Sequence, residues 1–375
     1  MTMDTMSAWL DGDMDGFEGP EKRLEIDFET PATSGEGLRV LPKQFWVDTV
    51  ALLRGSILDE LKTEHFDAYL ISESSLFVYP YRVIMITCGT TTLLNTLPQV
   101  ILAGKQCKLR IDWVQYSRKN FIFPSKQIQP HTSFDEEVRV LKKQFPEGSP
   151  YVLGPLDSDH WFVFMADYID RAVTQEKDQF LNIYMHDLDE EISDIFLYGD
   201  GPLPSAEEVT QRSGIDKLVP GSTVQAHVFD PCGYSINGIL GESYFTIHVT
   251  PESHCSYASF ETNLPLTSYD QLINSVLAVF RPRRAQTIIL WDEGSRLGPA
   301  KPKPVLIPGL VLKNTTVNEC EPGYKIEVVN YRTAKELMSP RAQLTPQNGS
   351  PKNATQLFSA ASAESPDSGA RVPAA

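Results

Sequence analysis

The chain of 375 residues is poor in cysteine: it has five, and no two of them form a Cys-x-x-Cys pair. An odd number of scattered cysteines does not make a disulfide framework, and the missing pairs disfavour a structural zinc site. We therefore expect free thiols in a reducing compartment and no bound metal ion. The five residues are Cys88, Cys107, Cys232, Cys255 and Cys320.

Long apolar runs and an excess of positive charge are also missing. No stretch approaches the roughly 18 consecutive apolar residues of a membrane-spanning helix. Residues 1–20 carry several aspartates and no apolar segment of the kind that a signal peptide needs. Lys and Arg number 33 against 49 Asp and Glu, a net charge of −16, whereas nucleic-acid binding requires a basic face. These absences predict a cytoplasmic protein that binds neither membranes nor nucleic acids.

The chain does have enough apolar sequence for a sizeable core. Its hydrophobic content is 41%, which suits one large domain or two smaller ones. Residues 1–16 read as a flexible acidic leader. From Ser339 onward, Ser, Pro, Ala, Gly and Asn dominate and apolar periodicity vanishes. Because such a composition cannot build a core, we expect residues 339–375 to be a disordered tail and residues 17–338 to hold the folded domain.

Strand-like runs outnumber helical patterns between these ends. Many strands with interspersed amphipathic helices predict an α+β fold in which helices cover one side of each sheet. We see no internal sequence repeat. The strand-like runs cover residues 68–71, 82–86, 161–165, 224–229, 244–249, 256–260, 287–291 and 325–329.

Helix signals occur at four places. A capping box at Ser133 begins the clearest helix. Thr267 is expected to cap a second helix, and Ser205 a shorter third one. Residues 90–102 also read as helical, with a kink expected at Pro98.

Residues 71–91 contain the most informative motif. An acidic residue and two serines, Glu73 to Ser75, separate two apolar runs, and a further β-like run leads to Cys88. From spacing alone, the ordinary interpretation is a polar turn followed by a buried cysteine.

The string ISESSLFVYP, with ITCGTT after it, closely resembles the self-cleavage segment of eukaryotic S-adenosylmethionine decarboxylases. Three further segments carry the same resemblance in the same order: FEGPEKRLEI, then VFDPCGYSINGI, then YFTIHVTPE followed by SYASFETN. The likeness runs from about Phe17 to the region of Phe280 and fades beyond Arg281. It implies a four-layer α/β/β/α sandwich of two antiparallel sheets flanked by helices.

The resembled family makes its cofactor from its own chain. The resemblance implies that the Ser74 hydroxyl attacks the carbonyl of Glu73, that an N-to-O acyl shift gives an ester, and that β-elimination cuts the chain into residues 1–73 and 74–375. A pyruvoyl group is then left at position 74. Its ketone forms a Schiff base with the substrate amine and provides the electron sink that decarboxylation requires.

The same likeness implies roles for five further residues. Cys88 is the expected proton donor, although a free buried cysteine is usually structural. His248 and Ser235 are expected to act in self-cleavage, although a histidine in an alternating strand is ordinarily a satisfied sheet residue. Glu18 and Glu21 are expected to be active-site carboxylates that face a cationic sulfonium substrate, in place of an ordinary solvated acidic segment.

Substrate contacts follow from the resemblance alone. Phe17 and Phe229 would sandwich the adenine ring, and Glu252 would accept hydrogen bonds from the ribose hydroxyls. Glu73 is expected to contact the substrate as well as to lie at the cleavage point. Without the family, the two phenylalanines would be assigned to the core.

Animal members of the family are stimulated by putrescine, which binds buried acids between the sheets. Glu25, Asp178 and Glu261 match such a diamine site, but three neighbouring positions depart from the pattern. Because a dication needs paired carboxylates to offset its desolvation, we expect a partial site with weak or altered stimulation. The departures are Phe180 for a threonine, Asn182 for a glutamate and Ile86 for a lysine.

The resemblance therefore implies a decarboxylase of S-adenosylmethionine that supplies the aminopropyl donor for spermidine and spermine. Its cleaved chains would form either a single heterodimer or a heterotetramer with two of each chain. One alternative is an inactive paralogue that regulates an active copy, and another is a pyruvoyl enzyme for a different amino acid. The first is disfavoured because all six catalytic and processing positions are retained, and the second because the adenosine-contacting positions are.

Overall fold

The computed structural model describes residues 16–335, except residues 34, 169–177, 200, 293, 298–303 and 321–322. The chain divides into two compact units, Met1–Glu336 and Leu337–Ala375, and the second lies wholly outside the described residues. The expected acidic leader, apart from Gly16, and the expected disordered tail also lie outside them, so both stay predictions. All described helices and strands belong to the first unit.

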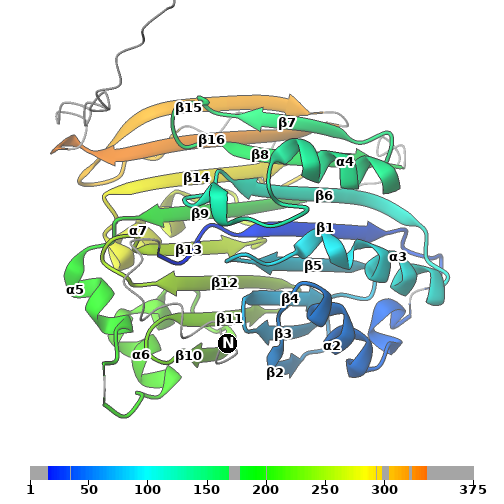
Figure 1. Ribbon diagram of the computed structural model, residues 1–375, viewed down its shortest axis with the longest axis horizontal. Coiled ribbons are helices and arrows are strands. Elements are labelled where there is room, and N and C mark those ends of the chain that lie inside the picture. Colours follow the sequence, from blue (N-terminus) through cyan, green and yellow to red (C-terminus); the bar gives the residue numbers. More distant parts are fainter. Residues whose placement is uncertain are drawn as a thin grey trace, which may run out of the picture. The chain divides into compact units, whose positions relative to one another are not determined.

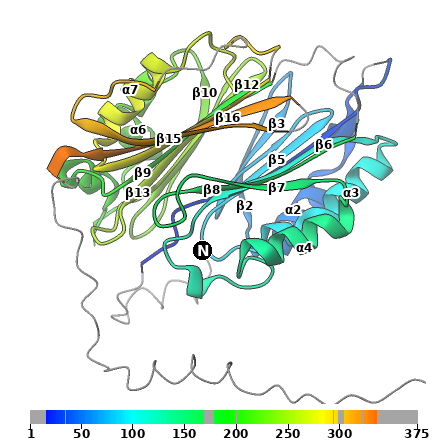
Figure 2. The ribbon, with the colours of Figure 1, turned by 90° about the horizontal axis from the view of Figure 1, so that it is seen from above.

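Two eight-stranded sheets lie face to face in the first unit, and every strand pair in them is antiparallel (Figure 2). The first sheet comprises β1 (Lys22–Phe28), β2 (Ile57–Lys62), β3 (Asp67–Ile71), β4 (Ser74–Val78), β5 (Arg82–Thr87), β6 (Ile111–Lys119), β7 (Ser149–Leu153) and β8 (Trp161–Asp167). The second comprises β9 (Gln179–His186), β10 (Thr223–Val228), β11 (Tyr234–Leu240), β12 (Ser243–Thr250), β13 (Tyr257–Thr262), β14 (Arg284–Trp291), β15 (Leu310–Cys320) and β16 (Tyr324–Thr333).

The two sheets share one topology. The strand order is β2-β3-β4-β5-β1-β6-β8-β7 in the first sheet and β10-β11-β12-β13-β9-β14-β16-β15 in the second. Adding eight to each label of the first order gives the second. The fold is therefore a structural duplication, although the sequence shows no internal repeat.

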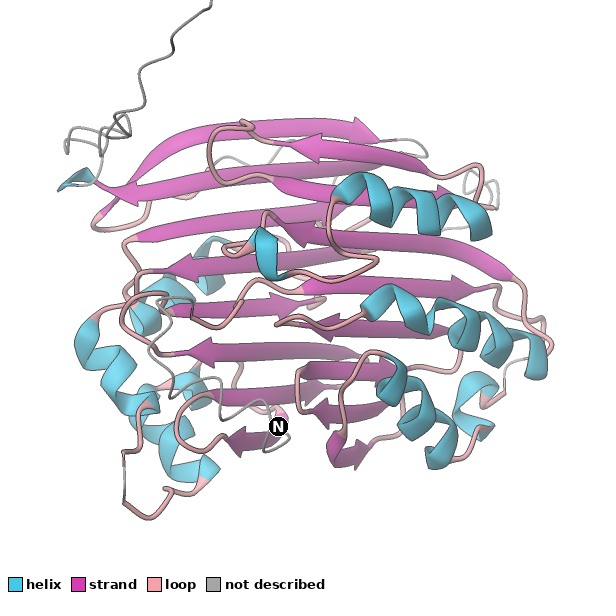
Figure 3. Ribbon diagram, in the orientation of Figure 1, coloured by secondary structure: helices cyan, strands magenta, loops and turns pink. Residues whose placement is uncertain are grey.

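Helices cover the outer face of each sheet, as Figures 2 and 3 show. Those on the first sheet are α2 (Lys43–Leu52), α3 (Leu97–Gln106) and α4 (Phe134–Gln144), and those on the second are α5 (Glu190–Ser193), α6 (Ala206–Ser213) and α7 (Asp270–Phe280) (Figure 1). Short 3₁₀ turns lie at Gly37–Val40, Leu93–Thr96, Pro124–Lys126, Asp194–Phe196 and Ile215–Lys217. Among the described residues, no helix is both long and apolar enough to cross a bilayer. The layering confirms the expected four-layer α/β/β/α sandwich.

Apolar side chains fill the two spaces between helices and sheets, and only part of the space between the sheets. One large cluster joins Trp46 and Val100 of the helices to the first sheet, and another joins Val276 of α7 to the second. Between the sheets lie two smaller clusters, one around Trp113 and one around Phe77. Buried polar and charged side chains also meet between the sheets, as in the contacts of Arg23 with Glu261 and of Ser75 with Asn237, and the candidate site lies among them.

Two details of the helices differ from expectation. Helix α7 begins at Asp270 without a side-chain cap, and it is the Ser268 hydroxyl, not Thr267, that accepts a hydrogen bond from the Asp270 amide. Pro98 lies in the first turn of α3 and does not kink it, because a proline there removes only an N–H that has no helical partner. The caps at Ser133 and Ser205 are confirmed, since each hydroxyl accepts a hydrogen bond from the amide three residues on.

Candidate active site

The turn between β3 and β4 holds the expected cleavage point. Ile71 and Ser74 are paired across this hairpin, and Glu73 lies at its tip. Ser74 has a φ of 142°, a region that L-residues rarely adopt. A non-glycine residue there stores roughly 1–3 kcal/mol of strain. The expected scissile peptide bond therefore precedes a strained residue in the uncut chain.

The Ser74 hydroxyl lies against the imidazole of His248. Ser74 Oγ is 2.8 Å from His248 Nε2, and Ser235 Oγ is 2.8 Å from His248 Nδ1. Ser235 on β11 is paired with His248 on β12, so the sheet register holds these two side chains together. The structure thus brings Ser74, Ser235 and His248 into one hydrogen-bonded row.

Burial decides the charge of that imidazole. It lowers the pKa of His248 to about 3, so the ring is neutral at physiological pH. A neutral imidazole has one acceptor and one donor nitrogen. We assign Nε2 as the acceptor for the Ser74 hydroxyl and Nδ1–H as the donor to Ser235. In this state His248 can take the proton of the Ser74 hydroxyl.

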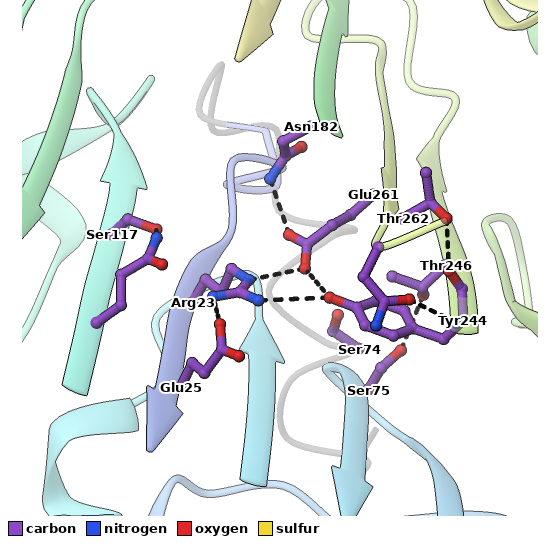
Figure 4. Close-up of polar contacts among 12 residues, drawn as sticks. Arg23, Glu25, Ser74, Ser75, Ser117, Asn182, Tyr244, Thr246, Glu261 and Thr262 are labelled. Atoms are coloured by element: carbon purple, nitrogen blue, oxygen red, sulfur yellow. Dashed lines mark hydrogen bonds and ion pairs between the residues drawn. The ribbon is translucent and has the colours of Figure 1, made fainter. Parts of the chain in front are cut away.

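Three polar residues that the sequence did not single out complete this network. Ser75 Oγ donates to Asn237 Oδ1 at 2.6 Å and lies 3.0 Å from Thr246 Oγ1. Thr246 Oγ1 is in turn 2.9 Å from His248 Nε2. Thr246 lies two residues before His248 on the same face of β12, and that spacing was the available signal. Figure 4 shows Ser74, Ser75 and Thr246 from the two facing sheets converging.

The carbonyl of Glu73 is held by the residue that follows β5. Its oxygen accepts hydrogen bonds from the Cys88 amide at 2.9 Å and from the Cys88 thiol at 3.2 Å. Burial raises the pKa of Cys88 well above its ordinary value, so the thiol keeps its proton. The loop after Cys88 is held in turn by Lys22 Nζ, which donates to the Gly89 carbonyl at 2.9 Å. Two donors thus polarise the carbonyl beside Ser74.

The two expected carboxylates are buried and hydrogen-bonded. Glu18 accepts from the amides of Ile122 and Phe123 at 2.8 and 2.7 Å. Glu21 accepts from Tyr257 Oη at 2.6 Å and from Ser259 Oγ. Burial raises the pKa of Glu18 and raises the pKa of Glu21 to about 7. Each carboxyl is therefore fixed in position, and Glu21 can gain or lose a proton near neutral pH.

A pocket opens beside this network. Phe17, Phe229 and Glu252 line it, and so do Glu73 and Cys88. Burial raises the pKa of both Glu73 and Glu252 to about 7. Ser235 and His248 also line this pocket. Glu21 lines a smaller cavity between the sheets, and His248 lines that cavity too. Glu18 lines neither of the two.

Comparison with known proteins identifies this arrangement. The family model of adenosylmethionine decarboxylase matches residues 14–332. The chain belongs to the adenosylmethionine decarboxylase family. It is 43% identical to the S-adenosylmethionine decarboxylase proenzyme of Dictyostelium discoideum over 330 residues, which cover 85% of this chain and 86% of that one. The Xenopus laevis proenzyme is 43% identical over 287 residues, 75% of this chain and 84% of that one.

A solved structure agrees with the fold. The crystal structure of the Trypanosoma brucei AdoMetDC-delta26 monomer matches with a TM-score of 0.55 and 35% identity, and covers 69% of this chain and 98% of that one. The family and the fold implied by the sequence motifs are both confirmed.

The residues expected to form a diamine site are already paired with arginines. Arg23 Nη1 is 2.7 Å from Glu25, and Arg23 Nε is 2.7 Å from Glu261 (Figure 4). Asp178 is not part of this group and lies 3.8 Å from Arg82, which also pairs with Glu25 at 3.0 Å. The guanidinium of Arg23 thus lies where a diamine would be expected between two of the acids.

The departures from the family pattern surround the same guanidinium. The Phe180 ring lies under it, 4.7 Å from its central carbon, and Asn182 donates to Glu261 at 2.9 Å. Ile86 lines the small cavity that Arg23 and Glu261 share with Glu21. These contacts make a compact cluster of paired charges and packed side chains between the sheets.

Proposed function

We propose that this chain is a proenzyme that cuts itself between Glu73 and Ser74 and then decarboxylates S-adenosylmethionine. One observation carries the proposal: the Ser74 hydroxyl lies 2.8 Å from a neutral imidazole, beside a carbonyl that two Cys88 donors polarise. A nucleophile, a base and a charge-stabilising pair are what an acyl shift requires. The relatives named as proenzymes support the same conclusion.

Self-cleavage begins with an acyl shift. Ser74 Oγ attacks the carbonyl carbon of Glu73, and its proton passes to His248 Nε2. Negative charge develops on the Glu73 oxygen, where the Cys88 N–H and S–H stabilise it. The C–N bond then breaks, the Ser74 nitrogen takes up the proton, and an ester joins the two residues. This step also releases the backbone strain at Ser74.

Elimination then cuts the chain. His248, neutral again after the shift, takes the Ser74 Cα proton, and the bond between Ser74 Cβ and the ester oxygen breaks. This releases residues 1–73 with a carboxylate at Glu73. The dehydroalanine that stays behind adds one water, loses ammonia and becomes a pyruvoyl group on a chain of 375 − 73 = 302 residues. The pocket suits this group, because it is lined by Glu73, Cys88 and His248, the residues around its point of origin.

The pyruvoyl group supplies an electron sink next to the substrate Cα. Cys88, protonated and lining the same pocket, donates the proton that replaces the lost carboxylate. Phe17 and Phe229 hold the adenine ring, and Glu252 accepts hydrogen bonds from the ribose. A cationic sulfonium substrate favours the ionised forms of Glu73 and Glu252, whose pKa burial raises to about 7.

The product class places the protein in polyamine synthesis. Decarboxylated S-adenosylmethionine is an aminopropyl donor for spermidine and spermine, and we expect the enzyme to act in the cytoplasm as a processed heterodimer or as a heterotetramer with two of each chain. An inactive regulatory paralogue is disfavoured, because the side chains of Ser74, Ser235, His248 and Cys88 all lie around the expected cleavage point.

Release of labelled CO2 from carboxyl-labelled S-adenosylmethionine tests the proposal. The wild-type protein should release it, and the Ser74→Ala variant should not, because the attacking hydroxyl is gone. Ser158→Ala, which removes a hydroxyl from a loop in the first sheet, is the matched control and should keep full activity. CO2 release by Ser74→Ala at the wild-type rate would refute the proposal.

A further inference from the structure

The turn after β12 gathers three metal-binding side chains. Glu252, His254 and Cys255 lie between β12 and β13, and their ligand atoms all lie within 4.8 Å of one another. The Cys255 amide donates to the Glu252 carbonyl at 3.0 Å, which closes the turn and brings the three side chains to one side. His254 and Cys255 have no part in the function proposed above.

The spacing of these atoms suits a tetrahedral transition metal. Two donors bound at about 2.0–2.3 Å to one tetrahedral zinc ion lie roughly 3.3–3.8 Å apart. Cys255 Sγ and His254 Nε2 are 3.7 Å apart. A thiolate, an imidazole and a carboxylate are the donors that zinc and cobalt accept, whereas calcium and magnesium prefer oxygen ligands alone.

Two further observations come from the surroundings of these donors. A Cβ atom built on Gly16 would overlap both Cys255 Sγ and His254 Nε2. Because position 16 is a glycine, the space beside these two donor atoms stays free of a side chain. Among the described residues, Glu252 Oε2 is buried without a hydrogen-bond partner. The Cys255 thiol is buried and His254 is exposed, which leaves one side of the turn accessible to an incoming ion.

The consequence lies in the pocket, because Glu252 also lines it. We propose that Glu252, His254 and Cys255 form a three-ligand site for a divalent transition metal such as Zn²⁺, and that the bound ion inhibits the enzyme. On binding, the Cys255 thiol releases its proton to solvent and the thiolate coordinates the metal. The Glu252 oxygens that bind the metal are then no longer available to the ribose. The inhibitory part rests on the proposed decarboxylase function, whereas the binding part does not.

Cobalt binding tests the site directly. Titration of the purified protein with Co²⁺ should give one equivalent of binding and a thiolate-to-cobalt charge-transfer band in the near ultraviolet, which Zn²⁺ abolishes. Cys255→Ser should lose the band, and His254→Ala should weaken binding by more than the roughly 10–100-fold that loss of an outer-shell partner causes. Cys107→Ser, a half-buried thiol on the far side of the first sheet, should change nothing. Absence of the band, or its persistence in Cys255→Ser, would overturn the site.

Inhibition is tested separately. Zn²⁺ should inhibit CO2 release competitively with S-adenosylmethionine, and EDTA should restore the rate. His254→Ala, on an exposed side chain, should keep the activity and lose the inhibition. Equal inhibition of wild type, His254→Ala and Cys255→Ser would place the metal on another thiol, such as Cys88, and refute the proposal. Cobalt binding without zinc inhibition would refute the claim that the ion competes for Glu252. If the protein released no CO2 at all, the proposed function would fail while the binding result would still stand.

Discussion

Replacing Arg23 with leucine tests whether this arginine offsets the charge of the buried carboxylates between the sheets. The Arg23 side chain is 3% exposed and lies 2.7 Å from both Glu25 and Glu261. Leucine removes the charge but keeps an apolar stem of comparable width. The variant therefore leaves two buried carboxylates without the cation that they share.

The expected loss of stability follows from the partners that stay behind. Removing one member of a buried ion pair costs about 3–5 kcal/mol. Glu25 keeps Arg82, and Glu261 keeps hydrogen bonds from Asn182 and Tyr244, which puts the loss at the lower end, about 3 kcal/mol. With an unfolding entropy of about 2.1 cal/mol/K per residue over the roughly 300 described residues, Tm should fall by about 5 °C.

Melting curves with and without putrescine test whether Arg23 takes the place of a diamine between the two acids. In the wild type, Arg23 already occupies the position between the acids, so millimolar putrescine should change neither Tm nor CO2 release substantially. In Arg23→Leu, the diamine should bind the freed carboxylates and raise Tm. Arg110→Leu removes a 79% exposed arginine paired with Glu29 and is the control, with a small expected effect. Strong stimulation of wild-type CO2 release at low diamine concentration would refute the reasoning. So would a Tm of Arg23→Leu that is the same with and without putrescine.

Two further predictions concern Cys88 and His248. Cys88→Ala keeps the backbone amide that holds the Glu73 carbonyl, so the variant should still cut itself, but its CO2 release should fall by about 10²–10⁴-fold. Full activity would remove Cys88 from the mechanism. Cys107→Ala is the control. The pKa of His248 is about 3 in the folded chain against about 6.5 unfolded, so its contribution to stability is present above pH 6.5 and is lost as the pH falls toward 3. Urea denaturation of the uncut Ser74→Ala variant should show that its free energy of unfolding falls by about 2 kcal/mol more between pH 7 and pH 5 than that of Ser74→Ala/His248→Gln. An equal fall in the two variants would contradict the buried, neutral imidazole.

Much of the site could be predicted because its members stand in recognisable strings. Ser74, Cys88, Ser235 and His248 each lie at the end or on the polar side of a strand, where their motifs put them. Strand β1 shows the limit of that reasoning. Its residues alternate between polar and apolar, a pattern typical of a strand with one solvated face, yet the whole strand is buried.

The reason lies in partners that are remote in sequence. Arg23 is paired with Glu261, 238 positions away on the opposite sheet, and no local pattern announces such a contact. The contact between Ser75 and Asn237 has the same cause, since it depends on how two sheets face each other. Periodicity shows which side chains share a face of one strand, but it does not show which strand lies opposite.

The mass of the purified chain tests the central claim most directly. Intact-mass spectrometry under denaturing conditions should find two chains, residues 1–73 and residues 74–375, and the larger should begin with a pyruvoyl group in place of Ser74. Ser74→Ala should give a single chain of 375 residues. A wild-type protein that stays in one piece after incubation at neutral pH, with Ser74 unmodified, would contradict the account.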